Sequence, residues 1–166
     1  DYRGGRGMTR ALLALLAIAS PASAARTSLG TFDGWGAFKD DNPARCYAIA
    51  QPVRGGGGKW RPFASVATWP RARVRGQVHI RLGREKLPNA PVTLTIGDQR
   101  FQMVAGGADV WAPDPRFDAA IVAAMRSAPL MRIATRATTG AAFTETYLLK
   151  GAATAIDAAA LGCARG

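Results

Sequence analysis

The sequence has few of the residues from which catalytic and metal sites are usually built. Its 166 residues include two cysteines (Cys46 and Cys163), one histidine (His79) and two glutamates (Glu85 and Glu145). Two distant cysteines and one histidine do not supply the ligands of a tetrahedral zinc site. Nothing places the glutamates across a scissile bond as a glycosidase pair requires, and there is no Gly-x-Ser-x-Gly elbow. We therefore expect no enzyme, no catalytic residue, no metal and no cofactor.

A phosphate-binding loop is also missing, although the stretch RGGGGKW (54–60) is rich in glycine and contains a lysine. The Walker pattern needs a glycine five positions before the Gly-Lys pair and a serine or threonine after it. Val53 and Trp60 occupy those positions, and Pro52 precedes the stretch. We predict a flexible loop here.

Apolar runs long enough to span a membrane are absent, because a spanning helix needs about 20 apolar residues. The longest run, Ala11–Ala19, follows Arg10 and is followed by the small-residue triplet 22–24. This order is typical of a secretory signal peptide. We assign 1–7 to upstream or expression-derived residues, 8–24 to the signal peptide and 25–166 to one mature domain without a transmembrane span. An N-terminal anchor is the alternative, and its apolar run would be too short.

The two cysteines are most simply a disulfide if the chain is exported, since isolated pairs oxidise outside the cytosol. A metal site and a catalytic thiol are the alternatives, and both lack partner residues. The pair Cys46 and Cys163 would tie the first part of the domain to its last turn. We predict a periplasmic or extracellular protein.

Acidic residues are scarce, and the basic excess is local. The chain has 22 Lys and Arg against 11 Asp and Glu. Residues 45–86 alone contain ten basic residues and one acid. Such asymmetry indicates an anionic partner or at least a strong local potential.

The stretch RARVRGQVHIRLG (71–83) alternates basic or polar residues with apolar ones. Alternate side chains of a strand point to opposite faces, so we predict a strand over 72–82 with one basic face. The candidate anion-binding residues on this face and in the loop beyond it are Arg73, Arg75, Arg81, Arg84 and Lys86. Arginine binds phosphate and carboxylate groups bidentately. The alternative is a solvated strand whose arginines deter edge pairing.

Candidate partners of that face are lipopolysaccharide, lipid head groups or an acidic protein. Nucleic acid is not expected, because export separates the protein from it and the basic face carries no aromatic residue for stacking. His79, on the same face, is expected to be a solvated strand residue.

The remaining pattern predicts an all-β fold with two short helices. Phe117, Ile121 and Met125 recur at helical spacing after Asp114-Pro115, a cap and first-turn pair. A second, alanine-rich helix is predicted over 152–161. Besides the basic strand, the pattern predicts strands over 32–38, 46–51, 63–69, 92–96, 100–104, 110–112, 130–137 and 142–149. The predicted total is eight or nine strands. Together they favour a β-sandwich with a helical insertion and a C-terminal helix.

These segments, in their order, resemble a known family. The segments are LGTFDGWGAF, RCYAIAQP, VRGQVHIRLG, VTLTIGDQRFQMV, AAIVAAMRSAPLMRIATRATTGAAFTETYLLKG and AIDAAALGC, from Leu29 to Cys163. They are similar to the invasion-associated locus B family of exported proteobacterial proteins. The resemblance implies an immunoglobulin-like β-sandwich in the cell envelope, a structural cysteine pair and no cofactor. It transfers no catalytic residue, and the arginine-rich strand departs from the family pattern.

The sequence therefore favours an exported, non-enzymatic accessory or binding protein of the cell envelope. The rival hypothesis is a periplasmic hydrolase whose site is built in the loops around carboxylates such as Asp114 or Glu145.

Overall fold

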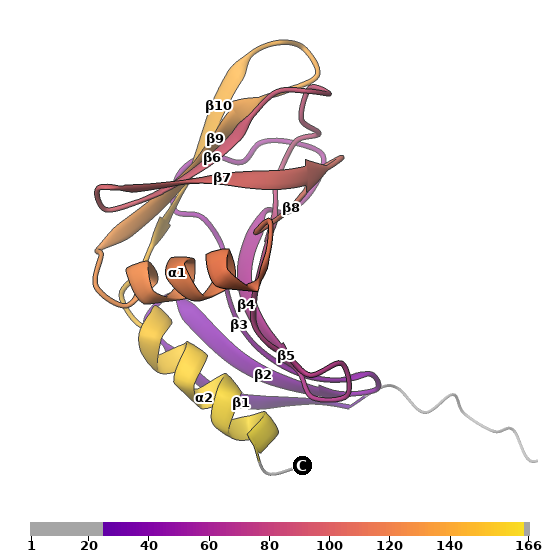
Figure 1. Cartoon of the computed structure of the whole chain (residues 1–166), viewed down its shortest axis with the longest axis vertical. Helices are drawn as coiled ribbons and strands as arrows, with labels where there is room; N and C mark the ends of the chain where they lie inside the picture. The colour runs from indigo at the N-terminus through magenta and orange to yellow at the C-terminus, as the bar shows by residue number, and fades with distance from the viewer. Residues whose placement is uncertain (1–24, 165–166) are drawn as a thin grey trace, which may run out of the picture.

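The computed structural model describes residues 25–164, which form ten strands and two helices (Figure 1). The predicted signal peptide lies outside the described residues. The elements in chain order are β1 (Arg26–Phe32), β2 (Trp35–Asp41), β3 (Ala44–Ala50), β4 (Phe63–Trp69), β5 (Val74–Arg81), β6 (Val92–Ile96), β7 (Gln99–Gly106), β8 (Asp109–Trp111), α1 (Pro115–Met125), β9 (Leu130–Arg136), β10 (Ala142–Leu148) and α2 (Ala152–Ala164).

The strands form one continuous antiparallel sheet in the order β1-β2-β3-β4-β5-β8-β7-β6-β9-β10. The strands β5 to β8 follow the order 5-8-7-6, which is a Greek key. The first half of β7 pairs with β6 and its last three residues pair with β8. The sheet therefore divides at β7 into two layers that enclose the core, as in a sandwich.

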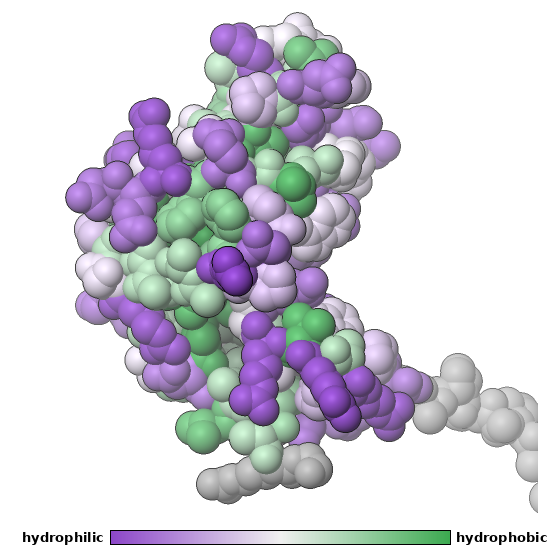
Figure 2. Space-filling view, viewed as in Figure 1, coloured by the Kyte–Doolittle hydropathy of each residue, from purple (hydrophilic) through white to green (hydrophobic). Residues whose placement is uncertain are grey.

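Both helices pack on the same side of the first layer (Figure 1). The helix α2 lies against β1 to β4, and α1 lies against β5, β6 and β7. We call this side the helix-covered face and the other side of β1 to β5 the open face. Trp35, Val66 and Ile80 are buried on the helix-covered face. Figure 2 shows that the exposed surface of the helices is largely apolar and is flanked by charged side chains.

The predicted fold class is confirmed: the chain is mostly antiparallel β-sheet, with a helix between β8 and β9 and another at the C-terminus. The prediction of a single first strand over 32–38 is wrong. A turn at Asp33, whose φ is +53°, divides this segment between β1 and β2. No strand is predicted over 26–31, because the small and polar residues there show no alternation. The strand β2 also extends to Asp41, beyond the end of the predicted segment at residue 38.

The disulfide prediction is confirmed. Cys46 of β3 and Cys163 of α2 are bonded, at a sequence separation of 117. Closing a loop of this size removes unfolded-state entropy equivalent to about 4–5 kcal/mol in the chain-entropy model. The bond fixes the last turn of α2 to the helix-covered face.

The glycine-rich segment is packed against two parts of the chain. Val53 and Arg54 exchange backbone hydrogen bonds with Thr146 of β10. A Cβ atom on Gly58 would lie 1.9 Å from the carbonyl oxygen of Gly83, so only glycine allows this approach. The run of glycines therefore permits close backbone packing, which is a structural role.

This segment covers a buried carboxylate. Glu145 is 1% exposed, and its Oε2 accepts a hydrogen bond from the backbone N–H of Gly83 at 3.1 Å. Burial raises the pKa of Glu145, and the Gly83 hydrogen bond and the charge of Arg84 oppose this only in part. Burial, followed by the charge of Glu145, also raises the pKa of Tyr147.

The substitution Glu145→Gln should change how stability depends on pH. Because the pKa of Glu145 is raised in the folded protein, the folded state binds its proton more tightly than the unfolded chain does. The free energy of unfolding should then fall as pH rises from about 4.3 through the folded-state pKa. The glutamine variant should lack this fall and be more stable than the wild type at neutral pH by about 1–3 kcal/mol.

Denaturant unfolding between acidic and neutral pH measures this difference. Glu85→Gln is the matched control, because Glu85 is exposed. Equal pH dependence of the wild type and Glu145→Gln would contradict the assignment.

Candidate functional site

An irregularity in β5 determines which way its arginines face. Val74 pairs with Trp69 and Gln77 pairs with Ala67, so Arg75 and Gly76 together oppose the single residue Thr68. This is a β-bulge, in which one extra residue interrupts the alternation of side chains. Gly76 has a φ of +66°, a value that glycine adopts without strain. The residues before the bulge are therefore shifted by one position relative to those after it.

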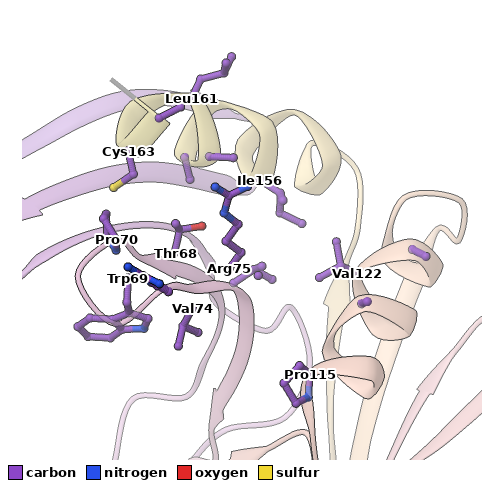
Figure 3. A pocket seen from close by; sticks show the side chains of 18 of the residues that line it. Thr68, Trp69, Pro70, Val74, Arg75, Pro115, Val122, Ile156, Leu161 and Cys163 are labelled. Carbon is purple, nitrogen blue, oxygen red and sulfur yellow. The ribbon is translucent and has the colours of Figure 1, made fainter. Parts of the chain in front are cut away.

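The prediction of one basic face over 71–81 is therefore wrong. Arg75 lies on the helix-covered side and lines a groove between the sheet and the two helices. In Figure 3 its side chain extends from the start of β5 toward α2. Arg73, with a φ of +55°, belongs to the turn before β5 and lines the same groove. Arg81, beyond the bulge, pairs with Asp109 of β8 instead.

The groove has a volume of about 910 Å³. Ligand sites for small molecules commonly have volumes of about 300–1,000 Å³ and a largely apolar lining. One wall is the end of β4, the following turn and the start of β5, including Val66, Pro70 and Val74. The helices supply the other walls, with Ala119, Val122 and Ala123 from α1 and Ile156, Ala159 and Leu161 from α2. The charged residues of the lining are Arg73, Arg75 and Arg126.

Each wall of the groove is anchored. Asp118 of α1 accepts a hydrogen bond from the backbone N–H of Val78 at 2.9 Å, beside the bulge. Burial raises the pKa of Asp118, and this hydrogen bond opposes it. Arg126 and Asp157 join the two helices through an ion pair of 2.8 Å. These contacts, with the disulfide at the end of α2, hold the walls of the groove in place.

The arginines of the open face, in contrast, have acidic partners. Arg81 Nε and His79 Nε2 lie 2.6 and 2.8 Å from the same oxygen of Asp109. Arg26 and Arg45 share Asp40 at 3.1 and 3.0 Å. Burial raises the pKa of each aspartate, but the hydrogen bonds from its basic neighbours lower it below the usual range overall. These pairs offset the positive charge of the open face.

Arg84 and Lys86 lie in a third setting, the loop after β5. The Arg84 guanidinium donates a hydrogen bond to the carbonyl of Gly56 and lies 5.9 Å from the ring of Phe143. The Lys86 ammonium donates to the carbonyl of Leu87. The five predicted anion-binding residues are thus divided among the groove, the open face and this loop.

Aromatic residues are present on the open face, although the basic strand itself contributes none. Neighbouring strands place Phe63 and Trp111 beside His79, each with its ring centroid 5.3 Å from the imidazole. Trp69 donates a hydrogen bond to Gln77. His79 is half-buried in this cluster and lies against Asp109, which differs from the expectation of a solvated strand residue. The expectation of no nucleic-acid partner now depends on export alone.

The carboxylates of the rival hydrolase hypothesis have structural roles. Asp114 caps α1 by accepting hydrogen bonds from the backbone N–H groups of Arg116 and Phe117, as its position before Pro115 predicts. Glu145 lies in the core, as described above. Within residues 25–164 no three histidine, cysteine or acidic residues gather into a set suited to a metal ion. In the same range no helix is long and apolar enough to cross a membrane.

The fold and the groove define a small, disulfide-bonded, mostly antiparallel β protein with an open groove of ligand size. The crystal structure of invasion associated protein B from Bartonella henselae has a similar fold, with a TM-score of 0.57 and 17% sequence identity. The similarity covers 82% of this chain and 98% of that one. No family model matches the chain, and no curated protein matches it in sequence.

The bulge predicts a specific cost for Gly76→Ala. A Cβ atom at this position would meet nothing within 4 Å, so the cost comes from the positive φ alone. We expect a loss of about 1–2 kcal/mol in the free energy of unfolding. Gly106→Ala is the control, because its added Cβ also meets nothing within 4 Å and its φ is outside the left-handed region. Equal losses in denaturant unfolding of the two variants would contradict the bulge.

Proposed function

We propose that this chain is an exported, non-enzymatic binding protein of the bacterial cell envelope, and that its groove binds an anionic ligand. Export is supported by the apolar N-terminal segment and by the Cys46–Cys163 disulfide. The fold similarity to the Bartonella protein and the segments quoted above support membership of the invasion-associated locus B family. Anionic envelope components such as lipopolysaccharide and lipid head groups are the proposed class of partner.

The placement of Arg73 and Arg75 is the observation that carries this proposal. Both are exposed, both line the groove, and neither has an ion-pair partner within residues 25–164. The groove lining includes no aspartate or glutamate. Guanidinium groups without a carboxylate partner are free to bind a phosphate or carboxylate bidentately. The groove therefore suits an anionic ligand better than the open face does.

A non-enzymatic role is supported by the placement of the acidic residues. Of the two carboxylates considered for a hydrolase, Asp114 caps α1 and Glu145 is buried in the core. A general acid or base must reach the proton that it transfers. Neither Asp114 nor Glu145 lines the groove, so neither is placed to act on a ligand bound there.

The substitution Arg75→Gln should weaken binding to lipopolysaccharide and to phosphatidylglycerol vesicles. Loss of one charge-assisted contact should reduce affinity by about tenfold at low salt, or about 1.4 kcal/mol. Wild-type affinity should itself fall as salt rises, since exposed charges are screened. Arg132→Gln is the matched control, because Arg132 is also exposed and lies on β9, away from the groove. Both variants are compared with the wild type by co-sedimentation or titration calorimetry.

The two variants separate specific binding from net charge. Normal binding by Arg132→Gln with weak binding by Arg75→Gln supports the groove. Equal weakening of both would indicate that net charge alone attracts the protein to anionic surfaces, and would contradict a ligand site in the groove.

A further inference from the structure

We infer that the ligand of the groove is an amphiphile, with one acyl chain lying along the groove and a carboxylate or phosphate head at Arg75. This inference rests on the proposed function and specifies its ligand. It also explains a feature that anion binding alone does not explain, namely the apolar surface behind the arginines.

The groove is open because the helices present small side chains to it. Ala119 and Ala123 of α1 and Ala159 and Ala160 of α2 all line it. Each has only a methyl group, so the space between the helices and the sheet stays unfilled. A protein interior is normally packed without such gaps. A concave apolar surface of this kind marks a place where another apolar group is accommodated.

The apolar lining continues past the alanines on both sides. Val66 and Val74 contribute from the sheet, Val122 from α1, and Ile156 and Leu161 from α2. Leu161 is 63% exposed. Val66 and Ile156 are already buried, whereas Val74, Val122 and Leu161 keep exposed apolar surface. An acyl chain in the groove would cover the exposed parts of these three side chains and remove apolar surface from water on both partners.

The positive charges are placed where a head group would lie. Figure 3 shows the Arg75 side chain extending from the start of β5 toward α2, and Arg75 lines the groove together with Val122 and Ile156. The turn before β5 adds Arg73. Arg126 is held by Asp157, so Arg73 and Arg75 are the groove arginines that have no acidic partner within the described part of the chain.

Other occupants fit these observations less well. A polyanion without an acyl chain would use the arginines and leave the apolar lining in water. A neutral lipid or an apolar helix of another protein would cover the lining and leave two guanidinium groups without a partner. Only a ligand with an apolar chain and an anionic end matches both parts of the groove, and the fixed walls favour its binding by reducing the cost of ordering.

The experiment is titration calorimetry of the disulfide-bonded protein with monomeric amphiphiles, below their micelle-forming concentrations. The probes are palmitate and hexadecyl phosphate, with monopalmitoylglycerol as the neutral ligand and octanoate, decanoate and inorganic phosphate as ligands with short or no chains. Palmitate or hexadecyl phosphate should bind, and affinity should rise by about fourfold for each methylene that becomes fully buried. Tighter binding of palmitate would indicate a free fatty acid, and tighter binding of hexadecyl phosphate would indicate a phospholipid-derived ligand.

Two alanines of α1 provide a matched pair of variants. Ala119 and Ala120 are both exposed, but only Ala119 lines the groove. Ala119→Phe should fill the groove and weaken palmitate binding by about tenfold or more, whereas Ala120→Phe should bind as the wild type does. Ala160→Phe repeats the test from α2, in case Ala119→Phe does not fold. Arg75→Gln should weaken palmitate binding by about tenfold and leave monopalmitoylglycerol unaffected.

The outcomes separate this inference from the proposed function. If inorganic phosphate or octanoate binds as tightly as palmitate, the inference that an acyl chain lies in the groove is wrong, and the proposed anion site is unaffected. If no amphiphile binds while Arg75-dependent binding to lipopolysaccharide persists, the inference again fails alone. If monopalmitoylglycerol binds as tightly as palmitate and Arg75→Gln has no effect, both the head group and the anion site are wrong. Equal binding by Ala119→Phe and Ala120→Phe would also overturn the inference.

Discussion

The covalent bond between Cys46 and Cys163 is the constraint on which the helix-covered face depends. The helix α2 consists largely of alanines, each of which buries little apolar surface when it packs against the sheet. The bond attaches the end of this helix to β3, where it forms one wall of the groove. The buried residues of α2 pack against β1 to β4, while its small exposed side chains leave the groove between α2, α1 and the β4–β5 turn open. Stability and an open cavity are thus achieved together.

The single extra residue in β5 gives this cavity its charge. Without the bulge, Arg75 would share a face with His79 and Arg81, where Asp109 is already bound by both. The bulge turns Arg75 to the helix-covered side, where the lining contains no acid. The chain therefore has two basic regions with different electrostatics: one whose arginines are neutralised by aspartates, and one whose arginines are available to a ligand. This difference is why we propose the ligand site in the second region.

Most strands, both helices and the disulfide follow from local patterns. Alternation located β4, β6, β9 and β10 to within a residue or two, and Asp114-Pro115 marked the start of α1. The site could not be predicted in this way. Gly76 inside the pattern was a signal for a bulge, but its effect on Arg75 appears only in the register with β4. The groove brings together segments from 66 to 164, and no local pattern encodes that contact. The aromatic neighbours of His79 were missed for the same reason.

The most direct test of the account is to map where a ligand binds. Chemical shifts of side-chain methyl groups and of arginine and indole N–H groups would be recorded by NMR with and without hexadecyl phosphate. The account predicts that the changes concentrate at Arg75, Val122, Ala159 and Leu161, around the groove. Changes confined to Trp111 and Arg81 on the open face, with the groove residues unaffected, would contradict it.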